Sequence, residues 1–163
     1  MSRIYYDWDV DYRALALQMG QERQAIRSKR GFAFLEELEQ ALLALRPRRL
    51  VADVLCDQQG EVCALGAVAR QRLVAQGASW AEAEAALQPY SEPEDWADGE
   101  PDDGATGYAV ATLGISRTLA WLIQEANDGP EDWPHRTPEQ RYDFVRGQVR
   151  RMLEGKLPVD RLP

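Results

Sequence analysis

An apolar repeat in the first third of the chain is the feature that most constrains the fold. Apolar side chains recur there at spacings of three and four residues, at Phe32, Leu35, Leu38, Leu42 and Leu45. This spacing places them on one face of an α-helix. Asp11 is a candidate cap for a helix that begins near Tyr12, and Pro47 is expected to end the helical region. The stretch therefore predicts helical structure from about residue 12 to 45, with breaks expected at Gly20 and Gly31.

Start signals for further helices occur along the rest of the chain. Ser79 with Glu82, and Thr137 with Gln140, match the capping box, in which two side chains satisfy backbone donors that the first turn leaves free. Ser116 precedes a strongly apolar stretch and is a third candidate cap. The predicted helices beyond Pro47 cover about residues 63–76, 79–88, 105–113, 116–127 and 137–155.

Residues 50–62 are the one place where extended structure is predicted. Residues 50–56 are compact and apolar, and the turn-like residues Asp57-Gln58-Gln59-Gly60 follow them. The sequence thus predicts a mainly α fold, a compact bundle of five or six helices with at most one short β-hairpin at about residues 50–62. We expect residues 1–163 to form a single domain, with an acidic loop at 89–104 within it.

Composition and the first residues bear on the cellular compartment of the protein. It contains no apolar run of 18 residues, so we expect no membrane span. The first residues, MSRIYYDWDVDY, lack the apolar region of a secretory signal, which favours a cytoplasmic location. The two cysteines are then expected to be free thiols, because such a compartment is reducing.

Acidic residues are concentrated in one segment. The formal charge is −8, yet residues 91–104 carry seven acids and no base, and the rest of the chain has a net charge of −1. A loop of this length is typically functional or a linker, and a linker would be solvated or would fold back on the Arg-rich last helix. As a docking surface it would attract a basic partner, with aromatic residues as apolar anchors. The candidate partner-binding residues are Tyr90, Glu92, Glu94, Asp95, Trp96, Asp98, Glu100, Asp102 and Asp103.

The cysteines and the single histidine offer little for catalysis or metal binding. Cys56 and Cys63 are spaced C-x6-C, and with His135 they fall short of the four ligands of a structural zinc site. The carboxylates near His135 lack EF-hand spacing. A helix N-terminus could lower the pKa of a Cys63 thiol, but small apolar neighbours favour a core position. We expect no metal and no cofactor, and a thiol-dependent enzyme at Cys63 is kept as an alternative.

Residues 106–127 match a helix-turn-helix only weakly. In ATLGISRTLAWLI, residues 111–123, the alanine and the apolar residue that normally flank the turn glycine are each one position too close. The second helix would present Arg117, Gln124 and Asn127 to DNA, and only one of these is basic. The pI of about 4.7 also opposes contact with phosphates. We do not expect direct nucleic-acid binding, and a DNA-binding regulator remains an alternative.

Three stretches carry a resemblance to other proteins. They are AIRSKRGFAFLEELEQAL (25–42), RRLVADVL followed by GEVCALGAV (48–68), and LGIS with an ND pair before TPEQRY (113–142). In these the chain resembles a group of small bacterial and phage proteins with no established activity. The resemblance spans about residues 25–150, and the acidic loop matches least. It implies a compact, mainly helical domain of mobile-element origin, and it assigns no role to any residue.

These observations together favour a protein that works by binding. The predicted function is a non-enzymatic protein-binding module that docks through an acidic surface. In the phage setting, such a protein would be an inhibitor of a host system, of the anti-CRISPR or nucleic-acid-mimic type. The expected partner is a basic surface of a host protein, including one that itself binds nucleic acid. Apolar surface on the helices would also be compatible with a homodimer.

Overall fold

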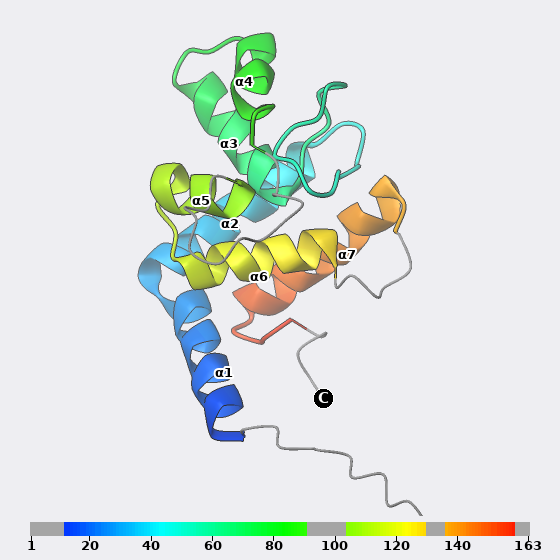
Figure 1. Ribbon diagram of the computed structural model, residues 1–163. Coiled ribbons are helices and arrows are strands. Elements are labelled where there is room, and N and C mark those ends of the chain that lie inside the picture. The colour runs from blue at the N-terminus through cyan, green and yellow to red at the C-terminus, as the bar shows by residue number, and fades with distance from the viewer. Residues whose placement is uncertain (1–11, 91–103, 130–135, 159–163) are drawn as a thin grey trace, which may run out of the picture.

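The computed structural model describes residues 12–90, 104–129 and 136–158, and within these residues the protein is built from helices (Figure 1). The helices are α1 (Tyr12–Arg27), α2 (Lys29–Ala44), α3 (Ala64–Ala75), α4 (Trp80–Leu87), α5 (Ala105–Tyr108), the π-helical turn η1 (Ala109–Leu113), α6 (Arg117–Asp128) and α7 (Pro138–Leu153). The prediction of a mainly α fold is confirmed. The described part contains seven α-helices, however, and not five or six.

The predicted helix caps are formed as expected. The Ser79 hydroxyl accepts a hydrogen bond from the backbone N–H of Glu82, whose side chain accepts one from the N–H of Ser79, so both halves of the capping box are present. The same reciprocal pair opens α7 at Thr137 and Gln140. Ser116 caps α6 through its hydroxyl, which accepts from the N–H of Leu119. Local signals therefore positioned these three helix starts correctly.

The break between the first two helices falls at Ser28, and the expectation of breaks at Gly20 and Gly31 is wrong. Ser28 has extended backbone angles (φ −60°, ψ 148°), and its hydroxyl accepts from the N–H of Gly31 as the N-cap of α2. Gly31 is needed for a different reason, because a Cβ there would overlap the carbonyl oxygen of Ala25. The chain turns at the serine because its side chain replaces the lost helical acceptor.

The core lies where α2, α3, α6 and α7 meet, with α2 packed on both α3 and α7, and α6 packed on α7. Most of the predicted α2 stripe is buried, since Leu35, Leu38 and Leu42 have no exposed surface. Phe32 is 41% exposed instead, and Phe34 occupies the core in its place.

The predicted hairpin at residues 50–62 is not formed in the described residues. One isolated antiparallel bridge joins Cys56 and Val62. Backbone bonds from Val51 to Val62, from Asp57 to Glu61 and from Cys63 to Leu55 cross the stretch. They do not extend into a ladder, because Leu50 N–H donates to the carbonyl of Pro138 and Leu55 N–H to that of Tyr90 instead. The stretch is a loop that ties α7, α3 and the end of α4 together.

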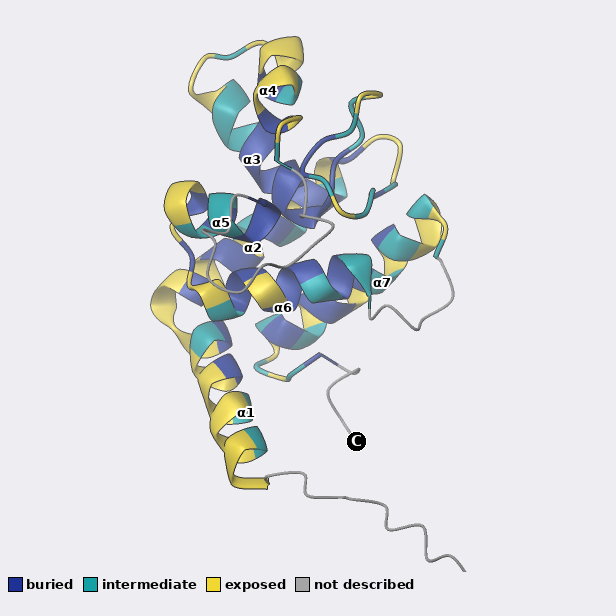
Figure 2. Ribbon diagram, in the orientation of Figure 1, coloured by how far each residue is buried: buried dark blue, intermediate teal, exposed yellow. Residues whose placement is uncertain are grey.

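Helix α1 is attached to the rest by only part of its length (Figures 1 and 2). It contacts α6 and α2, and its buried residues, Glu22 and Ile26, lie in its second half. Its first half is exposed, with Tyr12 at 76% and Leu17 at 63%. No helix in the described part of the chain is long and apolar enough to cross a membrane.

Candidate functional site

The acidic segment, residues 91–103, directly follows Tyr90, the last described residue after α4. All the other candidate partner-binding residues, from Glu92 to Asp103, lie outside the described residues. Tyr90 is half-buried: its carbonyl accepts from the N–H of Leu55 (2.9 Å), and its own N–H donates to the carbonyl of Leu87 (3.2 Å). The chain is therefore held in place up to the residue that precedes the acidic segment.

The described chain resumes at Gly104, four residues before Tyr108, which contacts Tyr90. Gly104, Ala105 and Thr106 are buried, and Gly104 is the N-cap residue of α5. The ring of Tyr108 meets the ring of Tyr90 edge-on, with 4.7 Å between the ring centroids. Burial raises the pKa of Tyr108, as expected for a phenol enclosed at such a contact. This aromatic pair joins the two ends of the acidic segment.

The described residues carry a charge opposite in sign to that of the whole chain. They contain 17 basic and 14 acidic side chains, a net charge of +3, whereas the whole chain has −8. The remaining residues hold 13 acids and two bases. Several arginines of the last helix are used within the fold: Arg141 donates to the carbonyl of Leu50, Arg150 pairs with Glu39, and Arg151 donates to the carbonyl of Leu157.

Both cysteines are buried free thiols, as the sequence predicted for Cys63. Cys63 is the N-cap residue of α3, and its Sγ accepts from the N–H of Gly66 (3.3 Å). The Cys56 thiol donates to the carbonyl of Asp57 (3.5 Å), and burial raises its pKa to about 11. Cys56 is therefore protonated at neutral pH, the opposite of an activated nucleophile.

The Asn127 and Asp128 pair at the end of α6 holds the loop before α3. The Asn127 side chain accepts from the N–H of Ala64 (3.0 Å) and donates to the carbonyl of Val51 (2.8 Å). Asp128 accepts from the N–H of Asp53 (3.2 Å) and from the Gln124 amide (2.6 Å), while burial raises its pKa. Gln124 and Asn127, which a helix-turn-helix would present to DNA, are thus buried and bonded inside the protein.

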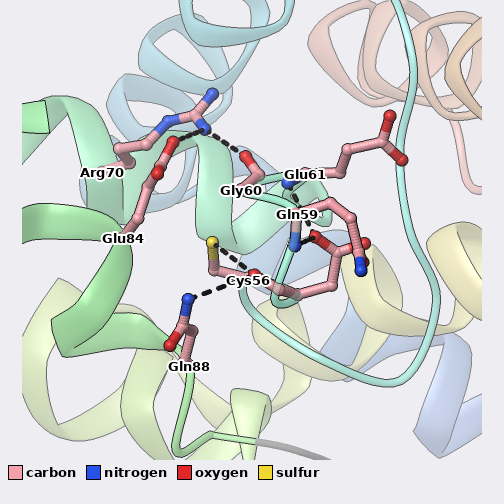
Figure 3. A network of polar contacts seen from close by, with 8 residues as sticks. Cys56, Gln59, Gly60, Glu61, Arg70, Glu84 and Gln88 are labelled. Carbon is pink, nitrogen blue, oxygen red and sulfur yellow. Dashed lines mark hydrogen bonds and ion pairs between the residues drawn. The ribbon is translucent and has the colours of Figure 1, made fainter. Parts of the chain in front are cut away.

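Residues 59–62 border a polar cavity that sequence reasoning missed. Figure 3 shows the polar contacts of the turn at residues 56–61 beside it. The Asp57 carboxylate accepts from the N–H groups of Gln59 (2.9 Å) and Glu61 (2.8 Å), which confirms the predicted turn. At Gly60 the φ angle is +82°, and a Cβ would lie 2.7 Å from the Glu84 carboxylate, so only glycine suits this position. The turn thereby brings its backbone directly against Glu84 on α4.

Arg70 of α3 is the charged centre of this cavity. Its Nη1 donates to the carbonyl of Gly60 (2.8 Å) and to Glu84 (3.4 Å), and its guanidinium lies 4.1 Å from the ring centroid of Trp80. Arg70 is only 6% exposed, and burial lowers its pKa while Glu84 raises it. The sequence signal for this site is an arginine that directly follows the small apolar run Ala67-Val68-Ala69.

Among the described residues, no group of three or more histidine, cysteine, aspartate or glutamate side chains is placed to hold a metal ion. His135, Glu131 and Asp132 lie outside the described residues. Comparisons with protein-family models, with curated proteins and with solved structures found no match.

Proposed function

We propose that this protein acts by binding, as a module that docks on a basic surface of a host protein through residues 90–103 and thereby inhibits that protein. The mobile-element setting implied by the resemblance favours an inhibitor over a metabolic enzyme. The partner's basic surface is of the kind that nucleic-acid-binding proteins carry, so the acidic segment would occupy the place of phosphates.

The observation that carries this proposal is that the acidic charge is concentrated in one segment, and that the residues at both ends of this segment are held in the fold. Seven acids lie between Tyr90 and Gly104, while the described residues have a net charge of +3. The Tyr90–Tyr108 contact keeps the start and the end of the segment together. Anchored ends lower the conformational entropy that the segment loses on binding, because loop closure has already taken place.

Charge and aromatic residues have different roles in this proposal. The carboxylates accelerate association with a basic surface and select against acidic ones. Buried aromatic side chains provide most of the affinity at interfaces, so Trp96 is assigned the role of apolar anchor. Tyr90, half-buried at the edge of the segment, extends that apolar contact.

The test compares two double charge reversals that change the net charge equally. Asp98→Lys/Asp102→Lys alters the acidic segment, and Glu36→Lys/Asp143→Lys alters two exposed acids on α2 and α7. Each immobilised variant is exposed to extract of the source cells at low and at high ionic strength, and captured proteins are identified by mass spectrometry. We expect the segment variant to capture several-fold less of a basic partner at low salt and to respond less to added salt.

The Glu36 and Asp143 variant is the control for net charge, and it should bind like the wild type. Equal capture by wild type and by both variants would contradict docking through the acidic segment. An equal loss in both variants would assign binding to overall charge, which also contradicts the proposal.

A further inference from the structure

Two arginines on the same helix differ in how their guanidinium groups are used. Arg70 and Arg72 both lie on α3, each pairs with a glutamate, and each lies near an aromatic ring. A guanidinium has five N–H donors arranged as a planar fork, and a structural arginine normally satisfies that fork with carboxylate or carbonyl oxygens. The two residues can therefore be compared donor by donor.

Arg72 uses all three of its nitrogens inside the protein. Its Nε and Nη2 bond the two carboxylate oxygens of Glu37, both at 2.7 Å, and its Nη1 donates to the carbonyl of Leu113 at 3.0 Å. The bidentate pair raises the pKa of Arg72. This is the arrangement of an arginine whose role is to join α3 to α2 and to the end of η1.

Arg70 is far more buried and yet less satisfied. One nitrogen, Nη1, serves both Gly60 and Glu84, and the contact with Glu84 is long at 3.4 Å. Nε is buried and has no hydrogen-bond partner, whereas Nη2 is not among the buried unpartnered atoms. Nη2 makes no hydrogen bond to any residue that the structure describes, and in Figure 3 it points away from Gly60 and Glu84. A buried cation with open donors is costly unless an acceptor completes its shell.

The open side of Arg70 belongs to a cavity of about 260 Å³ between the 59–62 turn, the end of α2 and the start of α4. Arg46 and Arg49 also line it, and Leu45, Pro47 and Val62 supply apolar wall. The two acids of the lining are both paired already, Glu61 with Arg49 at 3.2 Å and Glu84 with Arg70.

We infer that this cavity is a binding site for a small organic carboxylate, with the open Nη2 of Arg70 as the central donor and Arg46 at the rim. The lining holds three cations and two anions, and Arg49 also pairs with Glu139 just outside it (3.1 Å). Arg46 is then the one lining cation without an ion pair to a described residue, which suits a single carboxylate group better than a doubly charged phosphate. The apolar wall and the indole of Trp80 suit a short carbon chain attached to that carboxylate. The site is independent of the function proposed above, because none of its residues lies in the acidic segment.

The test uses the full chain and simple anions as probes. Sodium propionate, sodium phosphate and sodium chloride are titrated at matched ionic strength, and the 1H–15N resonances of the Arg70 side chain and the Trp80 indole are followed, with Trp80→Phe used for assignment. We expect propionate to shift both resonances saturably, and chloride to leave them unchanged. Phosphate should bind more weakly than propionate.

Substitutions separate a ligand site from a purely structural arginine. Arg70→Lys keeps the charge and removes the fork, and it should weaken propionate binding by about tenfold or more. Arg46→Gln, at the exposed rim, should weaken binding several-fold with little effect on folding, which keeps the test valid even if Arg70→Lys is unstable. Arg72→Lys is the matched control on the same helix and should leave binding unchanged.

Three results would overturn the inference. The first is the absence of any saturable shift with propionate. The second is equal binding by wild type and by both Arg70→Lys and Arg46→Gln. The third is tighter binding of phosphate than of propionate, which would reject the assigned ligand class.

Discussion

At the scale of single residues, the small side chains of the sequence GEVCALGAV have separate structural roles. Cys63 caps α3 through its sulfur, and its side chain is fully buried. Gly66 lies against the backbone of the preceding loop, where a Cβ would overlap the carbonyl oxygen of Leu55. The first turn of α3 therefore touches the loop backbone directly, and only glycine permits that approach.

Gly66→Ala should lower the free energy of unfolding by about 1–3 kcal/mol, because the added methyl group meets backbone atoms that cannot rotate away. Gly147→Ala on α7 is the matched control, since a Cβ there meets no atom within 4 Å. It should instead stabilise the protein by about 0.5–1 kcal/mol through helix propensity. Urea unfolding followed by circular dichroism measures both. Similar destabilisation by the two substitutions would contradict the close approach at Gly66.

At the scale of elements, α1 depends on its second half for attachment. Ile26 is 1% exposed and belongs to the main core, whereas Leu17 is largely exposed two and a half turns earlier. Burial of apolar surface provides most of the stabilising free energy. The two positions should therefore respond very differently to the loss of the same kind of side chain.

Ile26→Ala should destabilise the protein by about 2–4 kcal/mol, because it removes buried methyl groups and leaves a cavity. Leu17→Ala should change the free energy of unfolding by less than about 0.5 kcal/mol, as exposed substitutions usually do. Thermal or urea unfolding of the two variants checks the difference. A loss above about 1 kcal/mol for Leu17→Ala would mean that this face of α1 is covered, for instance in a homodimer, and a concentration series would then detect the association.

At the scale of the whole molecule, charge is divided between the described helices and the rest of the chain. The described residues have a net charge of +3, and the full chain has −8. A polyanion would be repelled by the chain as a whole, and α6 commits Gln124 and Asn127 to internal hydrogen bonds. Both facts weigh against the DNA-binding alternative.

Wild-type protein should therefore give no retarded complex with a pool of DNA duplexes at about 0.15 M salt, measured by electrophoretic mobility shift. The comparison variant replaces the seven acids of residues 91–103 by their amides, which brings the net charge to −1. Binding by that variant alone would show that the acidic segment prevents contact with DNA. A sequence-selective complex with the wild type would contradict our proposal and support a regulator.

The positions of the helices were determined by the sequence itself to within a few residues. Apolar spacing, the capping boxes at Ser79 and Thr137, and the Ser116 cap are local signals that act within one or two turns, so they are readable in the order of the residues. The sequence did not predict the break at Ser28, because a glycine alone does not indicate which residue caps a helix. It did not predict the exposure of Phe32 either, because apolar spacing alone does not indicate which side chains of a helix face are covered.

The loop at residues 50–62 and the cavity around Arg70 were decided only by the tertiary structure. Leu50 finds its acceptor at Pro138 and Leu55 finds its own at Tyr90, and no local pattern announces partners so far along the chain. Arg70 follows a small apolar run, but no local pattern indicates that Glu84 and Trp80 of α4 will lie against it. Backbone donors and buried charges must be satisfied somewhere, but the place depends on which segments the fold brings together.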